Sequence, residues 1–287
     1  LLPENTTHQD HFPTDYTGHR SHTCSTAIIP IASGKTFSDQ TGKFIVPSSR
    51  GNNYLFILYD YDSNHIHAEP IPNRLATTIQ SAFAKVHNIL VKAGLRPQLH
   101  MLDNECSQLL KDFMTSEGLD YQTTPAGNHR RNAAERAIQT YKNHFISGLC
   151  STDPNFPLHL WDLLVPQSNL SLNLLRRSRI NPNLSAWAQI YGNFDYNAHP
   201  IGPPGTHVVI FDNNKSTWGS HGLDAWYLAP NLQSYRTYST WVWETKSQRH
   251  NVETLTWYPT RLHMPTASPT DVIIAVTKDL TKALQKP

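Results

Sequence analysis

Residues 54–59 read Tyr-Leu-Phe-Ile-Leu-Tyr, an uninterrupted apolar run with the length of a buried β-strand. The turn-forming residues Gly51-Asn52-Asn53 come directly before it. We therefore expect the preceding extended segment, about residues 36–45, to pair with it in antiparallel orientation. Residues 65–71 alternate between apolar and polar side chains and predict a third strand.

Helical and extended patterns then alternate along the chain. Apolar residues at Ile79, Phe83, Val86 and Leu90 predict a helix within residues 74–92, which Gly94 ends. A short strand over 98–102, a helix around 109–114 and a strand over 119–123 follow. After a Pro/Gly loop at 125–132, one helical stripe is apolar and comprises Ala134, Ile138, Tyr141, Phe145 and Leu149. The alternation predicts an α/β domain.

The last third of the chain has a different character. Further helices are expected over 157–175 and 185–191, and Pro203-Pro204-Gly205 marks a boundary. Five of the seven tryptophans follow it, namely Trp218, Trp226, Trp241, Trp243 and Trp257. Short strands separated by frequent turns predict a small β-barrel, in which most of these rings pack in the core, although some could stack on bases. Residues 266–287 form a tail that could be an amphipathic helix.

Composition restricts the possibilities without deciding among them. The 287 residues have room for one large domain or two smaller ones, and a net charge of +2 does not by itself indicate nucleic acid. Three cysteines without tight spacing argue against a disulfide framework and favour a reducing compartment. No apolar run is long enough to span a membrane, and no signal peptide is recognised. Because the chain opens with Leu1, we expect a fragment of a longer polyprotein.

Residues 1–34 form a polar leader that contains His19, His22 and Cys24. This spacing invites a zinc interpretation, but structural zinc normally takes four ligands, commonly with paired cysteines. We therefore predict no zinc here.

Three carboxylates stand at informative positions in the predicted elements. Asp103 directly follows the short strand 98–102, and Asp39 follows an extended stretch. Glu135 lies within the basic heptapeptide Arg130-Arg131-Asn132-Ala133-Ala134-Glu135-Arg136, where a helix begins. Carboxylate oxygens are the ligands that Mg²⁺ prefers, so the pattern suits a site that holds two divalent metals against a phosphodiester.

Each carboxylate also has an ordinary structural interpretation. Asn132 and Glu135 resemble a capping box, and Asp103-Asn104 could be a turn. Asp60 and Asp62 compete with Asp39 for the first position, because they follow the stronger strand. We prefer Asp39, and the order of all three carboxylates favours the catalytic interpretation.

The motifs resemble those of the integrases of copia-type LTR retrotransposons, in the superfamily of retroviral integrases. Asn132 to Arg136 match that family's Asn-x-x-Glu-Arg motif, Asp103-Asn104 match its second carboxylate, and Asp39 with Gly42 match its first. The resemblance covers roughly residues 35–265. It implies a ribonuclease-H-like mixed five-stranded sheet with flanking helices over 35–195, followed by a small β-barrel over 200–265. One departure is that the segment between Asp103 and Glu135 is shorter than in many integrases.

The resemblance also implies a function. Asp39 and Asp103 would share one Mg²⁺ or Mn²⁺ ion, and Glu135 would complete the second site. The activity would be 3′-end processing and strand transfer, which insert element DNA into host DNA in the nucleus after a cytoplasmic particle stage. The implied partners are double-stranded DNA and further copies of the chain.

DNA contacts are expected from the polar side chains around Glu135: Arg130, Arg131, Arg136, Gln139 and Lys142. A solvated basic helix face is the alternative. Arg176, Arg177 and Arg179 could bind phosphate or cap a helix C-terminus. Two other functions stay open: a catalytically inactive DNA-binding relic, and a ribonuclease-H-type nuclease.

Overall fold

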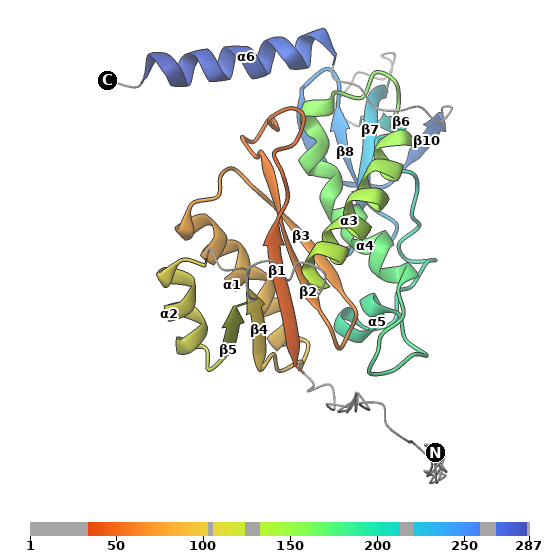
Figure 1. Ribbon diagram of the computed structural model, residues 1–287. Coiled ribbons are helices and arrows are strands. Elements are labelled where there is room, and N and C mark those ends of the chain that lie inside the picture. Colours follow the sequence, from red (N-terminus) through yellow and green to blue (C-terminus); the bar gives the residue numbers. More distant parts are fainter. Residues whose placement is uncertain (1–33, 103–105, 124–132, 213–220, 259–267, 286–287) are drawn as a thin grey trace, which may run out of the picture. The chain divides into compact units, whose positions relative to one another are not determined.

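The computed structural model describes residues 34–102, 106–123, 133–212, 221–258 and 268–285. Its first sheet contains β1 (Lys35–Gln40), β2 (Tyr54–Asp60), β3 (Ile66–Ile71), β4 (Leu99–Leu102) and β5 (Asp120–Thr123). The strand order is β3-β2-β1-β4-β5, with the first three strands antiparallel and β4 and β5 parallel to β1 (Figure 1). This arrangement confirms the predicted ribonuclease-H-like mixed sheet.

Helices cover both faces of this sheet (Figure 1). One face packs against α1 (Ala76–Lys92) and α2 (Gln108–Ser116). The other packs against α3 (Ala133–Cys150), the 3₁₀ helix η2 (Leu158–Leu164) and α4 (Val165–Leu175). The short helix α5 (Ala186–Tyr191) follows.

Because helices pack on both faces of the sheet, the strand β2 is apolar along its length. Phe56 and Leu58 belong to the core cluster of α1 and α2, whereas Leu55, Ile57 and Tyr59 belong to the cluster of α3 and α4. Successive side chains of a strand point to opposite faces, so a strand covered on both faces is apolar throughout.

Two predicted elements differ from the observed ones. The strand expected over 36–45 ends at Gln40, because beyond it only isolated backbone bonds continue, such as Thr41 N–H to the Leu55 carbonyl (2.9 Å). The helix expected over 157–175 is divided into η2 and α4. Pro166 stands at this junction and has no N–H, so it is favourable in the first turn of α4 and unfavourable inside a longer helix.

A second, antiparallel sheet follows α5 along the chain. It contains β6 (His207–Phe211), β7 (Gly222–Pro230), β8 (Tyr238–Val242), β9 (Ser247–Val252) and β10 (Leu255–Tyr258), in the order β10-β6-β7-β8-β9. Where a β-barrel was predicted, the strand pairs of the described residues form a five-stranded sheet with no ladder between β9 and β10. Trp226 packs into the α3 and α4 cluster, as expected for a core tryptophan, and Leu228 of the same strand joins it there.

Helix α6 (Pro269–Leu284) is the last element of the described chain. Ser268 and Asp271 form a capping box at its start, which satisfies backbone N–H groups of the first turn. Across the described ranges, no helix combines the length and apolarity that crossing a membrane requires. The leader residues His19, His22 and Cys24 lie outside the described residues.

Candidate active site

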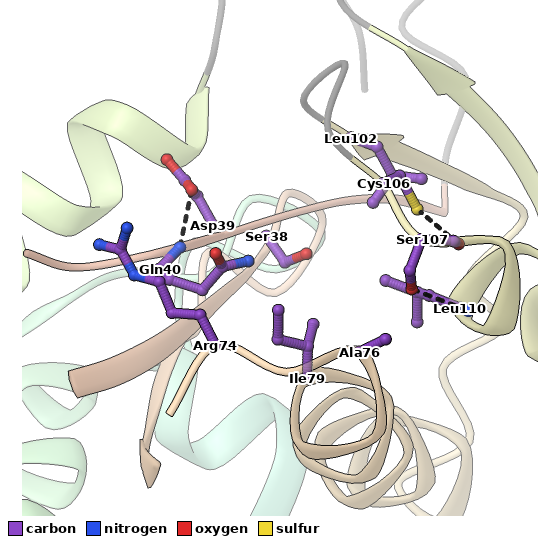
Figure 2. Close-up of a pocket in the computed structure, with 10 residues that line it drawn as sticks. All are labelled: Ser38, Asp39, Gln40, Arg74, Ala76, Ile79, Leu102, Cys106, Ser107 and Leu110. Atoms are coloured by element: carbon purple, nitrogen blue, oxygen red, sulfur yellow. Dashed lines mark hydrogen bonds between the residues drawn. The ribbon is translucent and has the colours of Figure 1, made fainter. Parts of the chain in front are cut away.

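Asp39 lies near the end of the central strand β1, on the face that α3 covers. Phe37 packs in the α3 and α4 cluster, and side chains two residues apart on a strand share a face. Figure 2 shows the Asp39 carboxylate leaving β1 on the side away from Ile79 of α1. The Gln40 N–H donates to Asp39 Oδ1 (2.7 Å), which fixes one carboxylate oxygen near the backbone.

A polar cavity of about 420 Å³ opens beside Asp39 (Figure 2). Its lining comes from β1, the end of β4 and the starts of α1 and α2: Ser38, Asp39, Gln40, Arg74, Ala76, Ile79, Leu102, Cys106, Ser107 and Leu110. The half-buried Asp39 is the carboxylate among them. Asp39 therefore lies at the edge of this cavity.

Glu135 lies in the first turn of α3 and is exposed. Its neighbour Ala134 is buried in the same cluster as Phe37. The first turn of α3 and the Asp39 side chain therefore stand on one face of the sheet. A carboxylate in a first turn also interacts favourably with the helix dipole, so the ordinary structural role of Glu135 is compatible with this geometry.

Three predicted site residues, Asp103, Arg130 and Arg131, lie outside the described residues. Strand β4 ends at Leu102, the residue before Asp103, and Leu102 lines the Asp39 cavity. Within the described parts of the chain, no three His, Cys, Asp or Glu side chains form a metal-binding group.

The remaining predicted DNA-binding residues lie on the outer surface of α3. Arg136, Gln139 and Lys142 are all exposed. Gln139 Nε2 donates to Asn143 Oδ1 (2.8 Å), and Lys142 lines a mostly apolar cavity of about 370 Å³ with Ile45 and Phe145. Gln139 and Lys142 share a helix face with Glu135, because they follow it by four and seven residues, about one and two helical turns.

Asp60 and Asp62, the competitors of Asp39, lie at the opposite end of the sheet. In the antiparallel ladder Asp60 pairs with Thr36 at the start of β1, whereas Gln40 pairs with Phe56. Asp60 is buried and accepts hydrogen bonds from the Ser63 N–H and hydroxyl, while Asp62 Oδ2 accepts from the Gly34 N–H. Burial raises the pKa of Asp60 to about 6. Asp60 therefore has its partners within the β2–β3 turn, and Asp62 joins that turn to the residue before β1.

Four polar residues of the Asp39 cavity were missed by sequence reasoning: Ser38, Gln40, Arg74 and Ser107. The Arg74 guanidinium lies 4.8 Å from the ring centroid of Tyr54 and donates to the Thr41 carbonyl. Arg74 is a single basic residue before α1, and nothing in the sequence around it indicates that it lines the same cavity as Asp39.

The arginines after α4 have mainly structural contacts. Arg176 Nε donates to the Asn64 carbonyl (2.8 Å), and the Arg179 guanidinium lies 3.9 Å from the Tyr61 ring centroid. Arg179 Nη2 also donates to the Tyr59 hydroxyl (2.8 Å). These bonds attach the chain after α4 to the β2–β3 turn.

Among comparisons with known proteins, only the one with solved structures finds similar proteins. No protein-family profile matches the sequence, and no curated protein matches it. The fold is similar to that of retroviral integrase catalytic core domains.

Three solved structures illustrate the similarity. The catalytic core domain of HTLV-2 integrase in complex with magnesium (trimeric form) is 21% identical, with a TM-score of 0.41 over 56% of this chain and 99% of that one. The catalytic core domain of BIV integrase is 14% identical, with a TM-score of 0.40 over 55% and 94%. The simian T-cell lymphotropic virus intasome in complex with the PP2A regulatory subunit B56 gamma is 16% identical, with a TM-score of 0.43 over 83% and 80%.

Proposed function

We propose that the chain is the integrase of a copia-type LTR retrotransposon, a metal-dependent polynucleotidyl transferase. Its activity would be 3′-end processing and joining of element DNA to host DNA. The observation that supports this best is the position of Asp39 near the end of β1, on the face of the sheet that the first turn of α3, with Glu135, also covers.

The strand register supports Asp103 as the second carboxylate. β1 and β4 are parallel, and Phe37 pairs with Met101. Asp39 comes two residues after Phe37 in β1, and in the sequence Asp103 comes two residues after Met101. Phe37 and Met101 both contact the α3 and α4 cluster, so the strand residues that precede the two carboxylates lie on one face of the sheet.

The carboxylate donors fit a site for hard divalent cations. Asp39, Asp103 and Glu135 would hold Mg²⁺ or Mn²⁺ through oxygen ligands. When bound, two such ions supply activation of the attacking oxygen and stabilisation of the leaving oxygen. The chain needs no nucleophile of its own, because water or a DNA 3′-hydroxyl attacks the phosphodiester. The protein contributes position and charge.

Double-stranded DNA would be bound by Arg130, Arg131, Arg136, Gln139 and Lys142, through phosphate contacts on and before α3. Joining two DNA ends would require several copies of the chain, and the product would form in the nucleus. We also propose the division into a leader (1–34), a catalytic core (35–195), a β domain (200–265) and a tail (266–287).

A strand-transfer assay tests the proposal. Purified chain, a short duplex that matches a terminal repeat and a supercoiled target are incubated with Mn²⁺, with and without chelator. We expect metal-dependent joining that Asp39→Asn, Asp103→Asn and Glu135→Gln each abolish while DNA affinity stays nearly unchanged. The matched controls are Asp112→Asn on α2 and Glu253→Gln after β9, both exposed and both expected to join DNA like the wild type.

Two results would contradict the proposal. A folded chain that binds DNA but joins none, with or without intact carboxylates, would indicate an inactive relic. Cleavage of an RNA–DNA hybrid that exceeds DNA joining, and that Glu135→Gln abolishes, would indicate a ribonuclease-H-type nuclease.

A further inference from the structure

His100 bridges the two strands that lead to the candidate metal site. Its Nδ1 lies 2.7 Å from the Thr36 hydroxyl oxygen, and its Nε2 lies 2.9 Å from the Ser38 hydroxyl oxygen. The ring is fully buried, and Phe83 of α1 covers it edge-on at 4.7 Å between ring centroids. Both ring nitrogens are therefore used inside an otherwise apolar layer.

Burial, with a smaller contribution from His87, lowers the pKa of His100 to about 3, so the ring is neutral at working pH. A neutral imidazole has one N–H donor and one acceptor nitrogen. One of the two hydroxyls therefore accepts a hydrogen bond from the ring, and the other donates one to it. This pattern is directional, and apolar side chains could not provide it.

The bridge acts on the register of β1 and β4. Thr36 pairs with His100 in the parallel ladder, and Ser38 is the neighbour of Asp39. A slip of one residue would direct Asp39 to the opposite face, and it would leave the buried imidazole without its partners. Ser38 also lines the cavity beside Asp39, so the bridge reaches the edge of the site.

We propose that His100 is a positioning residue that orients Asp39, through Thr36 and Ser38, for metal binding. This inference rests on the proposed function for its consequence in DNA joining. Its structural part has an independent reporter, because the Gln40 N–H donates to the Asp39 carboxylate. The Gln40 amide resonance in an NMR spectrum therefore reports the orientation of that carboxylate.

The test compares two double variants of β1. Thr36→Val with Ser38→Ala removes both hydroxyls at nearly constant volume, whereas Thr36→Ser with Ser38→Thr keeps them. We expect the first pair to shift the Gln40 amide resonance and to weaken Mn²⁺ binding and DNA joining by about 10-fold to 100-fold, the range of orienting partners in metal sites. The second pair should restore all three measurements to wild-type values.

Two histidine variants complete the test. His100→Leu should reproduce the first pair, and adding Ser38→Ala to it should have no further effect, since both changes break one bridge. His87→Leu is the matched control, because His87 is also buried but lies on α1, and the hydrogen bonds found among the described residues join the Thr36 and Ser38 hydroxyls to His100 and not to His87. It should leave the Gln40 resonance in place.

The outcomes separate the two proposals. An unchanged Gln40 resonance and unchanged Mn²⁺ affinity in the variant without hydroxyls would overturn the positioning role. A wild-type chain that neither binds Mn²⁺ nor joins DNA would overturn the proposed function, and the Gln40 resonance alone would then decide the role of His100.

Discussion

Asn169 of α4 binds both backbone groups of Ala68 on the edge strand β3. The Ala68 N–H donates to Asn169 Oδ1 (3.0 Å), and Asn169 Nδ2 donates to the Ala68 carbonyl (2.9 Å). One helical turn later, Asn173 makes the same pair of bonds to Ile66 (2.9 and 2.8 Å). The two amides take the place of a sixth strand and close an edge that could otherwise pair with another chain.

Asn169→Leu should therefore destabilise the core. It leaves the buried N–H and carbonyl of Ala68 without partners, at a cost of about 1–3 kcal/mol for each group. Urea unfolding should show a loss of about 2–6 kcal/mol, with self-association at high protein concentration. Asn143→Leu on the exposed surface of α3 is the matched control, and equal losses in the two variants would refute the role of Asn169.

The sequence predicted the order of elements because their periodicities are local. The spacing of Ile79, Phe83, Val86 and Leu90 predicts α1, and the run 54–59 predicts β2, whatever lies elsewhere in the chain. The choice between Asp39 and Asp60 is not local. Both carboxylates stand near strand ends, and only the antiparallel pairing of β1 with β2 separates them to opposite ends of the sheet. For the same reason, Arg74 and His100 could not be connected to the site before the strands were paired.

Asp60 should make stability depend on pH. Burial raises its pKa to about 6, so between about pH 4 and 6 the native state binds a proton that the unfolded chain does not. Stability from this group therefore rises as pH falls through that window, by up to about 3 kcal/mol for a shift of about two units. Asp60→Asn should remove this rise in urea unfolding measured from pH 8 to pH 4.5, and it should leave DNA joining intact.

The control for this experiment is Asp112→Asn, an exposed carboxylate on α2 that should keep the wild-type pH dependence. Loss of joining in Asp60→Asn with unchanged stability would instead make Asp60 a site residue.

The bond between Asp271 and His159 should hold the start of α6 against the core at neutral pH and weaken in acid. Burial acts to raise its pKa, but hydrogen bonds from Ser268 and His159 lower it below the usual range. His159 Nδ1 lies 2.8 Å from Asp271 Oδ1. A lowered pKa gives stability that is complete above the unfolded value, about 3.9, and is lost as pH falls through the folded one. The amide protection of α6, corrected for intrinsic exchange, should fall below about pH 4.

Asp271→Asn should reduce that protection at neutral pH by about 1–2 kcal/mol, the scale of a lost cap and a charge-assisted bond. Asp279→Asn, on the exposed side of the same helix, should not. Identical exchange in both variants would show that the Asp271 bonds do not anchor α6.

Lys142 should contribute one phosphate contact to DNA binding. Its stem lines the apolar cavity with Phe145 while the residue is exposed, so the ammonium is available to a ligand on the Glu135 face of α3. Lys142→Met keeps the stem and removes the charge. The slope of log K against log salt for duplex DNA should then become shallower by about 0.9, because one condensed counterion fewer is released.

Lys92→Met is the matched control and should keep the slope. Lys92 ends α1, whereas the Asp39 cavity lies at the start of that helix. An equal change of slope in both variants would mean that the duplex is attracted by overall charge, and a change in neither would place the DNA away from this face of α3.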